Sequence, residues 1–344
     1  MVRFIIRRLL QAVPLFLIIS IGLFYLANHL GDPLLSFSGN GARILPEDRL
    51  RLTRLMGLDK PVYVQYIIWL VGNDWIKVDT DGDGVPDEFG TRKGILRDDF
   101  GNSFTEKRPA MDVISERVKN TLLLMITVEV VVLIFSILIG IYSALHQYSV
   151  MDNLITTLSF IGYSMPIFWA AMMLMYIFGL NFKRWGLPYF PLVGMYELDV
   201  GPTILQIIWH MVLPVASLSI VSIAGYSRYV RSQMLEVINQ DYIRTAYAKG
   251  MPVRRVILGH ALKNASLPLI TIIGMDLPML LGGAVVTESI FGWPGMGLLF
   301  YNAALSADIP VLMGIMVIIS ILVIVFQIIT DITYTFLDPR IRYD

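Results

Sequence analysis

An acidic stretch of the chain repeats carboxylates with the spacing of a cation-binding loop. Its aspartates are Asp79, Asp81, Asp83 and Asp87. Counted from Asp79, they occupy the first, third, fifth and ninth positions, with Gly84 at the sixth, and this is how a loop wraps oxygen ligands around Ca²⁺. Gly90 stands at the twelfth position, where such loops carry a bidentate Glu, so the cage needs another ligand, such as Glu88 or a backbone carbonyl. The stretch predicts either a structural calcium site or an acidic, solvated turn.

The rest of the sequence offers little for catalysis. The chain has no cysteine, which excludes disulfides, thiolate metal sites and cysteine nucleophiles, and its four histidines are scattered without metal-ligand spacing. It also has no G-x-x-x-x-G-K-[ST] phosphate loop. Glu129, His210, Asp276 and Glu288 lie in or near apolar segments, where ionisable side chains usually face the protein interior, and they either line a path or pack between helices. These residues therefore form no recognisable catalytic or cofactor motif.

Between residues 228 and 266, the sequence predicts two short helices joined at a glycine. Asp241 is expected to cap the first helix, Gly250 to end it in the left-handed conformation, and Pro252 to begin the second. The first helix is expected to expose small and aromatic side chains, namely Tyr242, Ala246, Tyr247 and Ala248. A helix of about two turns is too short to be stable alone, but it fits a groove on a partner protein. The alternative is an ordinary solvated connector.

The elements that position these residues are membrane-spanning helices. Hydrophobic residues make up 56% of the 344-residue chain and charged residues 16%, whereas soluble domains carry about a quarter charged residues. The formal net charge is zero and Lys and Arg form no long run, which argues against a nucleic-acid partner. A helix needs about 20 apolar residues to cross the bilayer with its backbone polar groups satisfied. Six segments qualify: Leu9–Ala27, Thr121–Leu145, Leu154–Leu180, Thr203–Ser227, Leu267–Ile290 and Val311–Phe336.

Basic residues predict the orientation of these spans. Clusters of Lys and Arg in residues 3–8, 228–263 and 340–342 fall on one side if there are six spans, and the positive-inside rule makes that side cytoplasmic. Both termini are then expected in the cytoplasm, in a multi-pass protein of the cell membrane. The pair Lys183–Arg184 falls on the other side and opposes the rule weakly. The run Leu9–Ala27 is too long for a signal peptide and no A-x-A site follows it, so we interpret it as an uncleaved first span.

The spans divide the chain into expected parts. Residues 1–30 form an N-terminal transmembrane helix, residues 31–120 a polar extracytoplasmic segment, residues 121–336 a five-helix core that includes the cytoplasmic loop 228–266, and residues 337–344 a cytoplasmic tail. Within the polar segment, Pro46–Leu70 predicts one or two short helices and Asp79–Gly90 a tight loop.

A series of short motifs follows in a fixed order along the chain. They are Gly31-Asp32-Pro33, Met56-Gly57-Leu58-Asp59-Lys60-Pro61, Asp99-Phe100-Gly101-Asn102-Ser103, Gly162-Tyr163-Ser164-Met165-Pro166, Glu288-Ser289-Ile290-Phe291-Gly292-Trp293-Pro294-Gly295-Met296-Gly297 and Leu337-Asp338-Pro339-Arg340. In this order they resemble the type I permeases of ABC importers, and among these the first of the two paired permeases of the oligopeptide/dipeptide permease family. Residues 73–96 do not fit that pattern and look like an insertion in the polar segment.

The cytoplasmic loop resembles the "EAA" motif of the same superfamily. Arg244-Thr245-Ala246 stands in place of Glu-Ala-Ala, Gly250 matches the glycine four residues on, and Leu262 matches a later leucine. His260 and Lys263 depart from the Ile and Pro of the general motif. The residues that the resemblance assigns to ATPase coupling are Asp241, Tyr242, Arg244, Thr245, Ala246, Ala248, Lys249 and Gly250.

The resemblance implies an all-α polytopic membrane protein with about six transmembrane helices and the type I ABC importer fold. It also implies that the chain is not an enzyme and has no intrinsic cofactor, since the partner ATPases bind and hydrolyse ATP. Such a chain would form the transmembrane path for di- or oligopeptides and would couple to cytoplasmic ATPases by alternating access. The implied partners are a second homologous permease, one or two ABC ATPase subunits that bind ATP, an extracytoplasmic solute-binding protein and membrane lipid. The residues that line the substrate path cannot be read from the sequence.

Other functions also fit parts of the sequence. The same machinery can import oligosaccharides or another solute. A secondary transporter or channel would need coupling-ion residues of its own and no docking helix for an ATPase. A membrane-embedded enzyme would need convergent catalytic groups, and Glu129 and Asp276 form no recognisable active-site motif.

Overall fold

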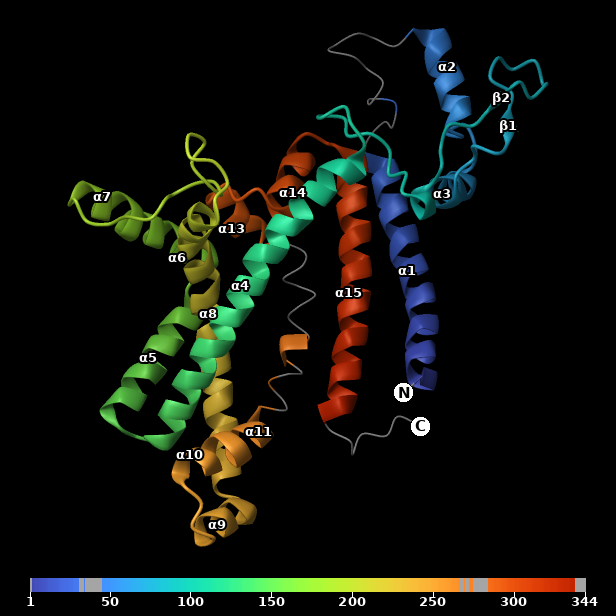
Figure 1. Ribbon diagram of the computed structural model, residues 1–344. Helices are drawn as coiled ribbons and strands as arrows, with labels where there is room; N and C mark the ends of the chain where they lie inside the picture. The colour runs from blue at the N-terminus through green and yellow to red at the C-terminus, as the bar shows by residue number, and fades with distance from the viewer. Residues whose placement is uncertain are drawn as a thin grey trace. The chain divides into compact units, whose positions relative to one another are not determined.

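Helices dominate the computed structural model (Figure 1). It describes residues 2–30, 45–266 and 284–337, together with Leu34, Leu269 and residues 272–274. The chain divides into two compact units, of which the first comprises residues 1–119 and 299–322 and the second residues 120–298 and 323–344. The predicted all-α class is confirmed.

The first unit contains three helices, a small hairpin and a 3₁₀ turn: α1 (Val2–Leu30), α2 (Pro46–Leu55), α3 (Val62–Val71), β1 (Lys77–Val78), β2 (Glu88–Phe89) and η2 (Ile95–Arg97). Three further helices have residues in both units: α4 (Ala110–Leu145), α14 (Met296–Leu305) and α15 (Ile309–Leu337). The apolar core of the first unit joins α1, α3, η2 and α15 through Ala27, Trp69, Ile95, Met313 and Val317.

Within the described residues, the regular secondary structure of the second unit is all helical. Its elements are α5 (Val150–Ser164), α6 (Ile167–Leu174), the π-helical segment η3 (Met175–Asn181), α7 (Phe182–Arg184), α8 (Ile204–Ile238), α9 (Asp241–Ala248), α10 (Val253–Arg255), the π-helical segment η4 (Val256–Ala261), α11 (Leu262–Ala265) and α13 (Val285–Ile290).

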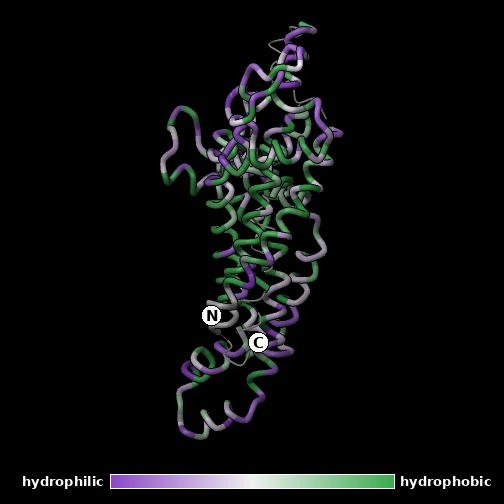
Figure 2. Tube along the Cα trace, turned by 90° about the vertical axis from the view of Figure 1, so that its right-hand side faces the viewer, coloured by the Kyte–Doolittle hydropathy of each residue, from purple (hydrophilic) through white to green (hydrophobic). Residues whose placement is uncertain are grey.

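Among the described residues, α1, α4, α8 and α15 are long and apolar enough to cross a membrane. They correspond to the spans predicted first, second, fourth and sixth along the chain. Hydrophobic residues, green in Figure 2, follow the long helices for most of their length. Helix α4 begins before the predicted start of its span, and α8 continues beyond the predicted end. These additional turns carry charged residues, which a search for apolar runs does not include.

The third predicted span, Leu154–Leu180, is bent in the structure. The chain bends by 107° between α5 and the helical stretch that begins at Ile167. Pro166 has no N–H and disfavours the helical conformation of the residue before it, and Met165 is accordingly extended, with φ −80° and ψ 126°. The segment is therefore a broken span or a re-entrant loop.

The fifth predicted span, Leu267–Ile290, lies largely outside the described residues. Its final turns form α13.

The polar segment between α1 and α4 contains more regular structure than the sequence predicts. The short helices expected in Pro46–Leu70 are α2 and α3. The loop Asp79–Gly90 belongs to a two-stranded antiparallel hairpin in which Lys77 pairs with Phe89 and Val78 with Glu88. Strands of two residues leave no alternating pattern in a sequence, so the hairpin was not predicted.

Side chains attach this hairpin to α2 and to the next loop. Arg51 on α2 forms an ion pair with Glu88, and Arg54 Nη1 donates to the carbonyl oxygen of Thr80 at 3.2 Å. The buried Asn73 donates to the carbonyl oxygen of Leu55 at 2.9 Å and accepts the N–H of Arg92 at 3.0 Å. The hairpin is thus held at its base and along one side.

Candidate functional site

Helix α9 is the short helix predicted in the loop after α8, and Figure 1 shows it beside α10 at the end of α8. Its N-cap residue is Gln240, which is extended (φ −74°, ψ 148°) and makes no side-chain cap hydrogen bond. The prediction that Asp241 caps the helix is therefore wrong by one residue, because Asp241 is the first helical residue. Its carboxylate still suits this place, since negative charge in a first turn complements the helix dipole. Arg244 Nη1 lies 3.9 Å from Asp241 Oδ1, but both side chains are exposed, so this pair contributes little.

The other end of α9 is closed by Gly250, as predicted. Gly250 has φ +74°, a left-handed conformation that favours glycine. Its N–H donates to the carbonyl oxygen of Tyr247 at 2.9 Å, and the N–H of Met251 donates to that of Ala246 at 3.3 Å. These two bonds make a Schellman motif, which satisfies the last carbonyl groups of the helix and reverses the chain.

Helix α9 buries one face and exposes the rest. Ile243 and Ala246 are buried, and they share a face because they are three residues apart. The expectation that Ala246 is exposed is wrong, because its side of the helix packs against η4. Ala248 and Tyr247 are exposed, as predicted. The exposed members of the predicted coupling set are Asp241, Tyr242, Arg244, Thr245, Ala248, Lys249 and Gly250.

A single apolar cluster supports α9 from beneath. It joins α8, α9 and η4 through Met234, Ile243, Ala246, Val256, Ile257 and Ala261. A polar contact adds α11, because Asn264 Nδ2 donates to the hydroxyl of Tyr242 at 3.0 Å. Protein interiors are close-packed and of low compressibility, so a displacement of α9 is carried to α8 and η4.

A partly buried ion pair connects α8 to the start of α5. Arg231 on α8 donates from Nε to Asp152 Oδ1 at 2.9 Å and from Nη2 to Oδ2 at 2.8 Å. Ser143 donates its hydroxyl to the same carboxylate, and the N–H of Tyr148 donates to Oδ2 at 2.9 Å. Sequence reasoning missed this group. Its detectable signal is the capping pattern from Ser149 to Asp152, in which the hydroxyl of Ser149 accepts the N–H of Asp152 at 3.1 Å.

Glu288 is a packing residue and caps a helix. Thr121 Oγ1 donates to Glu288 Oε1 at 2.9 Å and accepts the N–H of Met296 at 2.7 Å. The other carboxylate oxygen, Oε2, accepts the N–H of Leu298 at 3.1 Å, so Glu288 satisfies a free donor in the first turn of α14. A Cβ atom at Gly295 would lie 2.4 Å from this oxygen, which explains the glycine in the motif. Of the two alternatives for Glu288, packing is the one the structure supports.

Two of the remaining ionisable residues of the apolar segments lie within the described part of the chain. His210 is buried and its Nδ1 lies 2.8 Å from the carbonyl oxygen of Gln206 in the same helix. Glu129 is also buried. Asp276 lies outside the described residues.

The acidic loop brings three of its four aspartates together. Carboxylate oxygens of Asp79, Asp81 and Asp83 lie within 4.8 Å of one another. Asp87 instead accepts hydrogen bonds from the N–H of Thr80 at 3.0 Å and from the Thr80 hydroxyl at 2.6 Å. The sequence predicted Asp87 among the ligands, but the structure does not group it with the other three carboxylates. Three convergent carboxylates fit a hard cation, but the cage lacks the ninth-position ligand and has no side chain at Gly90.

Backbone donors already compensate part of the charge in this loop. The N–H groups of Gly82 and Gly84 donate to Asp79 at 2.5 and 2.9 Å, and they hold the pKa of Asp79 below its ordinary value. The hydrogen bonds from Thr80 lower the pKa of Asp87 in the same way. The loop is therefore ordered by its own hydrogen bonds and presents negative charge at neutral pH.

Comparisons with known proteins agree with this architecture along the whole chain. The family model "Binding-protein-dependent transport system inner membrane component" matches residues 136–343, and the model for the N-terminal part of such components matches residues 1–125. The chain belongs to this family of inner membrane transport components. The prediction that the chain is not itself an enzyme is confirmed by this membership.

Several curated relatives match the chain from end to end. The oligopeptide transport system permease protein AppB of Bacillus subtilis is 40% identical over 345 residues, with 100% of both chains covered. A putative peptide permease protein of Brucella suis is 34% identical over 344 residues, with 99% of each covered. The dipeptide transport system permease protein DppB of Escherichia coli is 32% identical over 363 residues, with 100% of this chain and 99% of DppB covered.

A solved structure of the MetNI methionine ABC transporter in an inward-facing conformation has a TM-score of 0.49 and 16% sequence identity to this chain. The match covers 66% of this chain and 97% of that one. The family membership rests on the sequence matches.

Proposed function

We infer that this chain is the membrane-spanning permease subunit of an ABC importer and that its cargo is a di- or oligopeptide. The observation that carries this inference is the end-to-end match to relatives named as oligopeptide and dipeptide permeases. The long apolar helices α1, α4, α8 and α15 supply the membrane-spanning part.

Helix α9 is the surface that contacts the partner ATPase in this proposal. Its buried face rests on α8 and η4, while Arg244, Thr245 and Ala248 point away from that support. A helix of two turns, closed by the left-handed turn at Gly250, fits a groove without needing to be stable alone. Because α9 is packed on α8, closure of an ATPase pair would move α8 together with α9, and this is what alternating access requires.

The other partners follow from the same proposal. They are a second homologous permease, one or two ABC ATPase subunits and an extracytoplasmic solute-binding protein. We place both termini and α9 in the cytoplasm, because the basic clusters of the sequence gather on one side of the predicted spans. The polar segment between α1 and α4 is then extracytoplasmic.

Two experiments test this proposal. The first is uptake of labelled di- and tripeptides by cells that carry the transporter genes with and without the ATPase genes, and we expect uptake to require both. Uptake that persists without the ATPases would make the chain a secondary transporter. The second is ligand binding by the partner solute-binding protein against peptide and oligosaccharide panels. Binding of oligosaccharides alone would keep the machinery and overturn the peptide cargo.

A further inference from the structure

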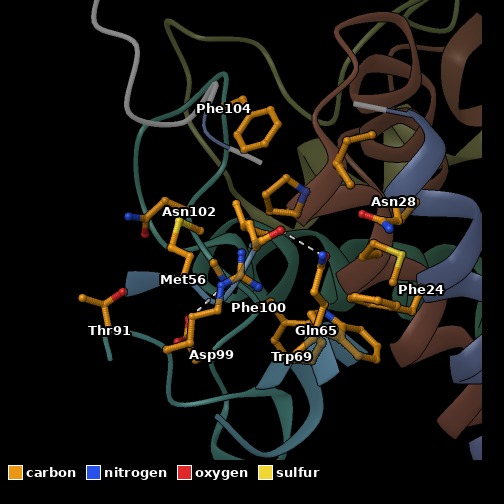
Figure 3. A pocket seen from close by; sticks show the side chains of 17 residues that line it. Phe24, Asn28, Met56, Gln65, Trp69, Thr91, Asp99, Phe100, Asn102 and Phe104 are labelled. Atoms are coloured by element: carbon orange, nitrogen blue, oxygen red, sulfur yellow. Dashed lines mark hydrogen bonds between the residues drawn. The ribbon is translucent and has the colours of Figure 1, made fainter. Parts of the chain in front are cut away.

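The first unit contains a cavity of about 220 Å³, whose wall includes the aromatic side chains of Phe24, Trp69 and Phe100 (Figure 3). Arg92 and Asp99 both line it, and the carboxylate of Asp99 attracts the guanidinium of Arg92. The arginine of this cavity therefore has a counter-charge in the same wall.

A second arginine, Arg228 on α8, is held between two aromatic rings of α5. Its Cζ atom lies 4.8 Å from the ring centroid of Phe160 and 4.8 Å from that of Tyr163, within the range of a cation–π contact. Its Nε donates to the carbonyl oxygen of Ala224 at 3.0 Å, which turns the side chain back along α8. Tyr163 in turn lies over Gly225, where an added Cβ atom would be 3.8 Å from the ring. The guanidinium is thus held in one place by both helices.

The terminal nitrogens of Arg228, Nη1 and Nη2, remain available to a ligand. Among the described residues, neither nitrogen has a hydrogen-bond partner, and Arg228 forms no ion pair. The carboxylates that α5 and α8 carry are those of Asp152 and Glu236. Asp152 already binds Arg231, and Glu236 lies eight residues beyond Arg228, about 12 Å along the helix axis. The two helices therefore fix a cation here without supplying a carboxylate for it.

This guanidinium lies at the depth of the predicted membrane spans. Phe160 and Tyr163 follow Leu154, where the third predicted span begins, by six and nine residues, or about 9–14 Å along the helix axis. The guanidinium is therefore within the apolar part of α5, although Arg228 itself follows the predicted end of a span at Ser227. Charged side chains at such a depth are costly, and they usually face the protein interior or a water-filled path.

The direction of the side chain argues against a lipid headgroup as its ligand. An arginine near the end of a span reaches lipid headgroups by extending toward the nearer membrane surface. For Arg228 that surface lies beyond the C-terminal end of α8, yet the side chain turns back toward Ala224. Phe160 and Tyr163 are 57% and 59% exposed, so a ligand can reach the guanidinium from their side.

A peptide that crosses the membrane carries such a ligand, because its C-terminus is a carboxylate. The two terminal nitrogens of an arginine can bind the two oxygens of a carboxylate, and the exposed rings beside it provide apolar contacts for peptide side chains. Resting on the peptide cargo of the proposed function, we propose that Arg228, held by Phe160 and Tyr163, binds the C-terminal carboxylate of the peptide within the transmembrane path. The site is indifferent to peptide sequence, since every peptide with a free C-terminus offers this group.

The test uses the purified complex of permeases and ATPases in phosphatidylcholine nanodiscs, without the solute-binding protein, which has peptide preferences of its own. Trialanine and trialanine amide compete with trialanine labelled with a fluorophore at its N-terminus, and fluorescence anisotropy gives both affinities. We expect the wild type to bind the free acid more tightly than the amide by about tenfold or more, as is typical for a charge-assisted contact. Arg228→Gln should bind both peptides as weakly as the wild type binds the amide. Arg254→Gln is the matched control, because it removes the same charge from an exposed residue of α10 and should keep the wild-type preference.

Two further variants keep the proposal testable if Arg228→Gln does not assemble. Arg228→Lys keeps the charge without the planar fork and should retain part of the preference for the acid. Phe160→Leu keeps every charge and removes one exposed ring, so it should assemble and show a reduced preference. An unchanged preference in Arg228→Gln, or in Phe160→Leu if Arg228→Gln does not assemble, would overturn the proposal. Loss of the second permease from both variants on size-exclusion chromatography would assign Arg228 to a subunit interface and would also overturn it.

A separate measurement distinguishes failure of this site from failure of the proposed function. It is ATP-dependent uptake of trialanine by the complete importer together with its solute-binding protein. If the wild type shows no such uptake, the peptide cargo itself is wrong, and the carboxylate site fails with it. If uptake is present but the acid and the amide bind the wild-type complex equally, the cargo stands and only the carboxylate site at Arg228 is wrong.

Discussion

Asp152 and Arg231 lie 79 residues apart in the sequence and meet through two parallel hydrogen bonds of 2.9 and 2.8 Å. The side chain of Asp152 is 2% exposed and that of Arg231 is 26% exposed. The pair therefore links the start of α5 to the part of α8 that leads to α9. A bidentate pair of this kind fixes orientation as well as distance.

Mutation of Arg231 and mutation of Asp152 should lower the stability by different amounts. Arg231→Gln leaves a buried carboxylate without its cation, whereas Asp152→Asn leaves a partly exposed guanidinium that water can reach. Breaking a fully buried pair costs about 3–5 kcal/mol, and we expect about 2–4 kcal/mol for Arg231→Gln and less for Asp152→Asn. Thermal unfolding of the purified chain measures both. The control is Glu116→Gln, which breaks the exposed pair with Arg108 and should lower the stability much less than Arg231→Gln. Equal losses of stability in all three variants would show that the ion pair between Asp152 and Arg231 does not stabilise the fold.

Ala246→Glu and Ala248→Glu separate the support of α9 from its contact surface. Ala246 is buried, so a glutamate there should displace α9 from η4 and lower the unfolding temperature. Ala248 is exposed, so the same change should leave stability within about 0.5 kcal/mol and weaken ATPase association. Co-purification of the ATPase together with thermal unfolding reads out both effects. Ala304→Glu, at an exposed alanine of α14, is the control for the added charge. Normal ATPase association in Ala248→Glu would remove this residue from the coupling surface.

Gly250→Val should abolish transport through backbone strain alone. A Cβ atom added at Gly250 would meet nothing within 4 Å, so no clash contributes. The left-handed conformation costs a residue with a side chain about 1–2 kcal/mol, and a β-branched residue more than others. Gly250→Asn should keep most of the uptake, because Asn tolerates this conformation. Equal peptide uptake in the Val and Asn variants would contradict the strain argument.

Hydropathy was sufficient to predict the straight membrane spans, but it did not predict the bend between α5 and α6. Helices α1, α4, α8 and α15 each carry an apolar run long enough for a membrane, and such a run needs no tertiary information to be recognised. The bend at Met165 depends on one local event, the presence of Pro166, which lacks an N–H and disfavours the helical conformation of the residue before it. An average over about twenty residues hides that event, although the proline itself was visible in the sequence.

The candidate site shows a similar limit. Ala246 and Ala248 are identical in type, and only the apolar pair formed by Ile243 and Ala246 at helical spacing indicates which alanine is buried. The partner of Asp152 could not be found, because nothing in a local pattern selects Arg231 among the basic residues of the chain. Contacts between distant segments depend on the assembled fold, whereas turns such as the one at Gly250 depend on a few neighbours.

The acidic loop should loosen at low pH. The pKa of Asp79 and that of Asp87 are lower in the folded loop than in an unfolded chain, because backbone N–H groups and Thr80 donate to their charged forms. The stabilisation is then fully present above the ordinary aspartate pKa of about 3.9 and is lost as the pH falls through the lower folded values. Hydrogen exchange of residues 77–90, corrected with an unstructured peptide of the same sequence, should show constant protection from pH 5 to 8 and a decrease below about pH 4. Protection that is independent of pH in this range would contradict the assignment of these hydrogen bonds.

The calcium hypothesis makes a further prediction that distinguishes ligands from structural residues in the same loop. Replacing Asp79, Asp81 and Asp83 by Asn removes charge from the three convergent carboxylates but keeps oxygen atoms, so Ca²⁺ affinity should fall by at least about tenfold. Asp87→Asn should instead loosen the loop without shifting the calcium midpoint, because Asp87 is bound to Thr80. Protease cleavage between Asn73 and Arg97, measured against Ca²⁺ concentration with Mg²⁺ as the control cation, reports both. Chelator should raise cleavage of the wild type to the level of the triple variant. If chelator changes neither cleavage nor thermal stability, the loop is an acidic turn held by its own hydrogen bonds and the calcium hypothesis is wrong.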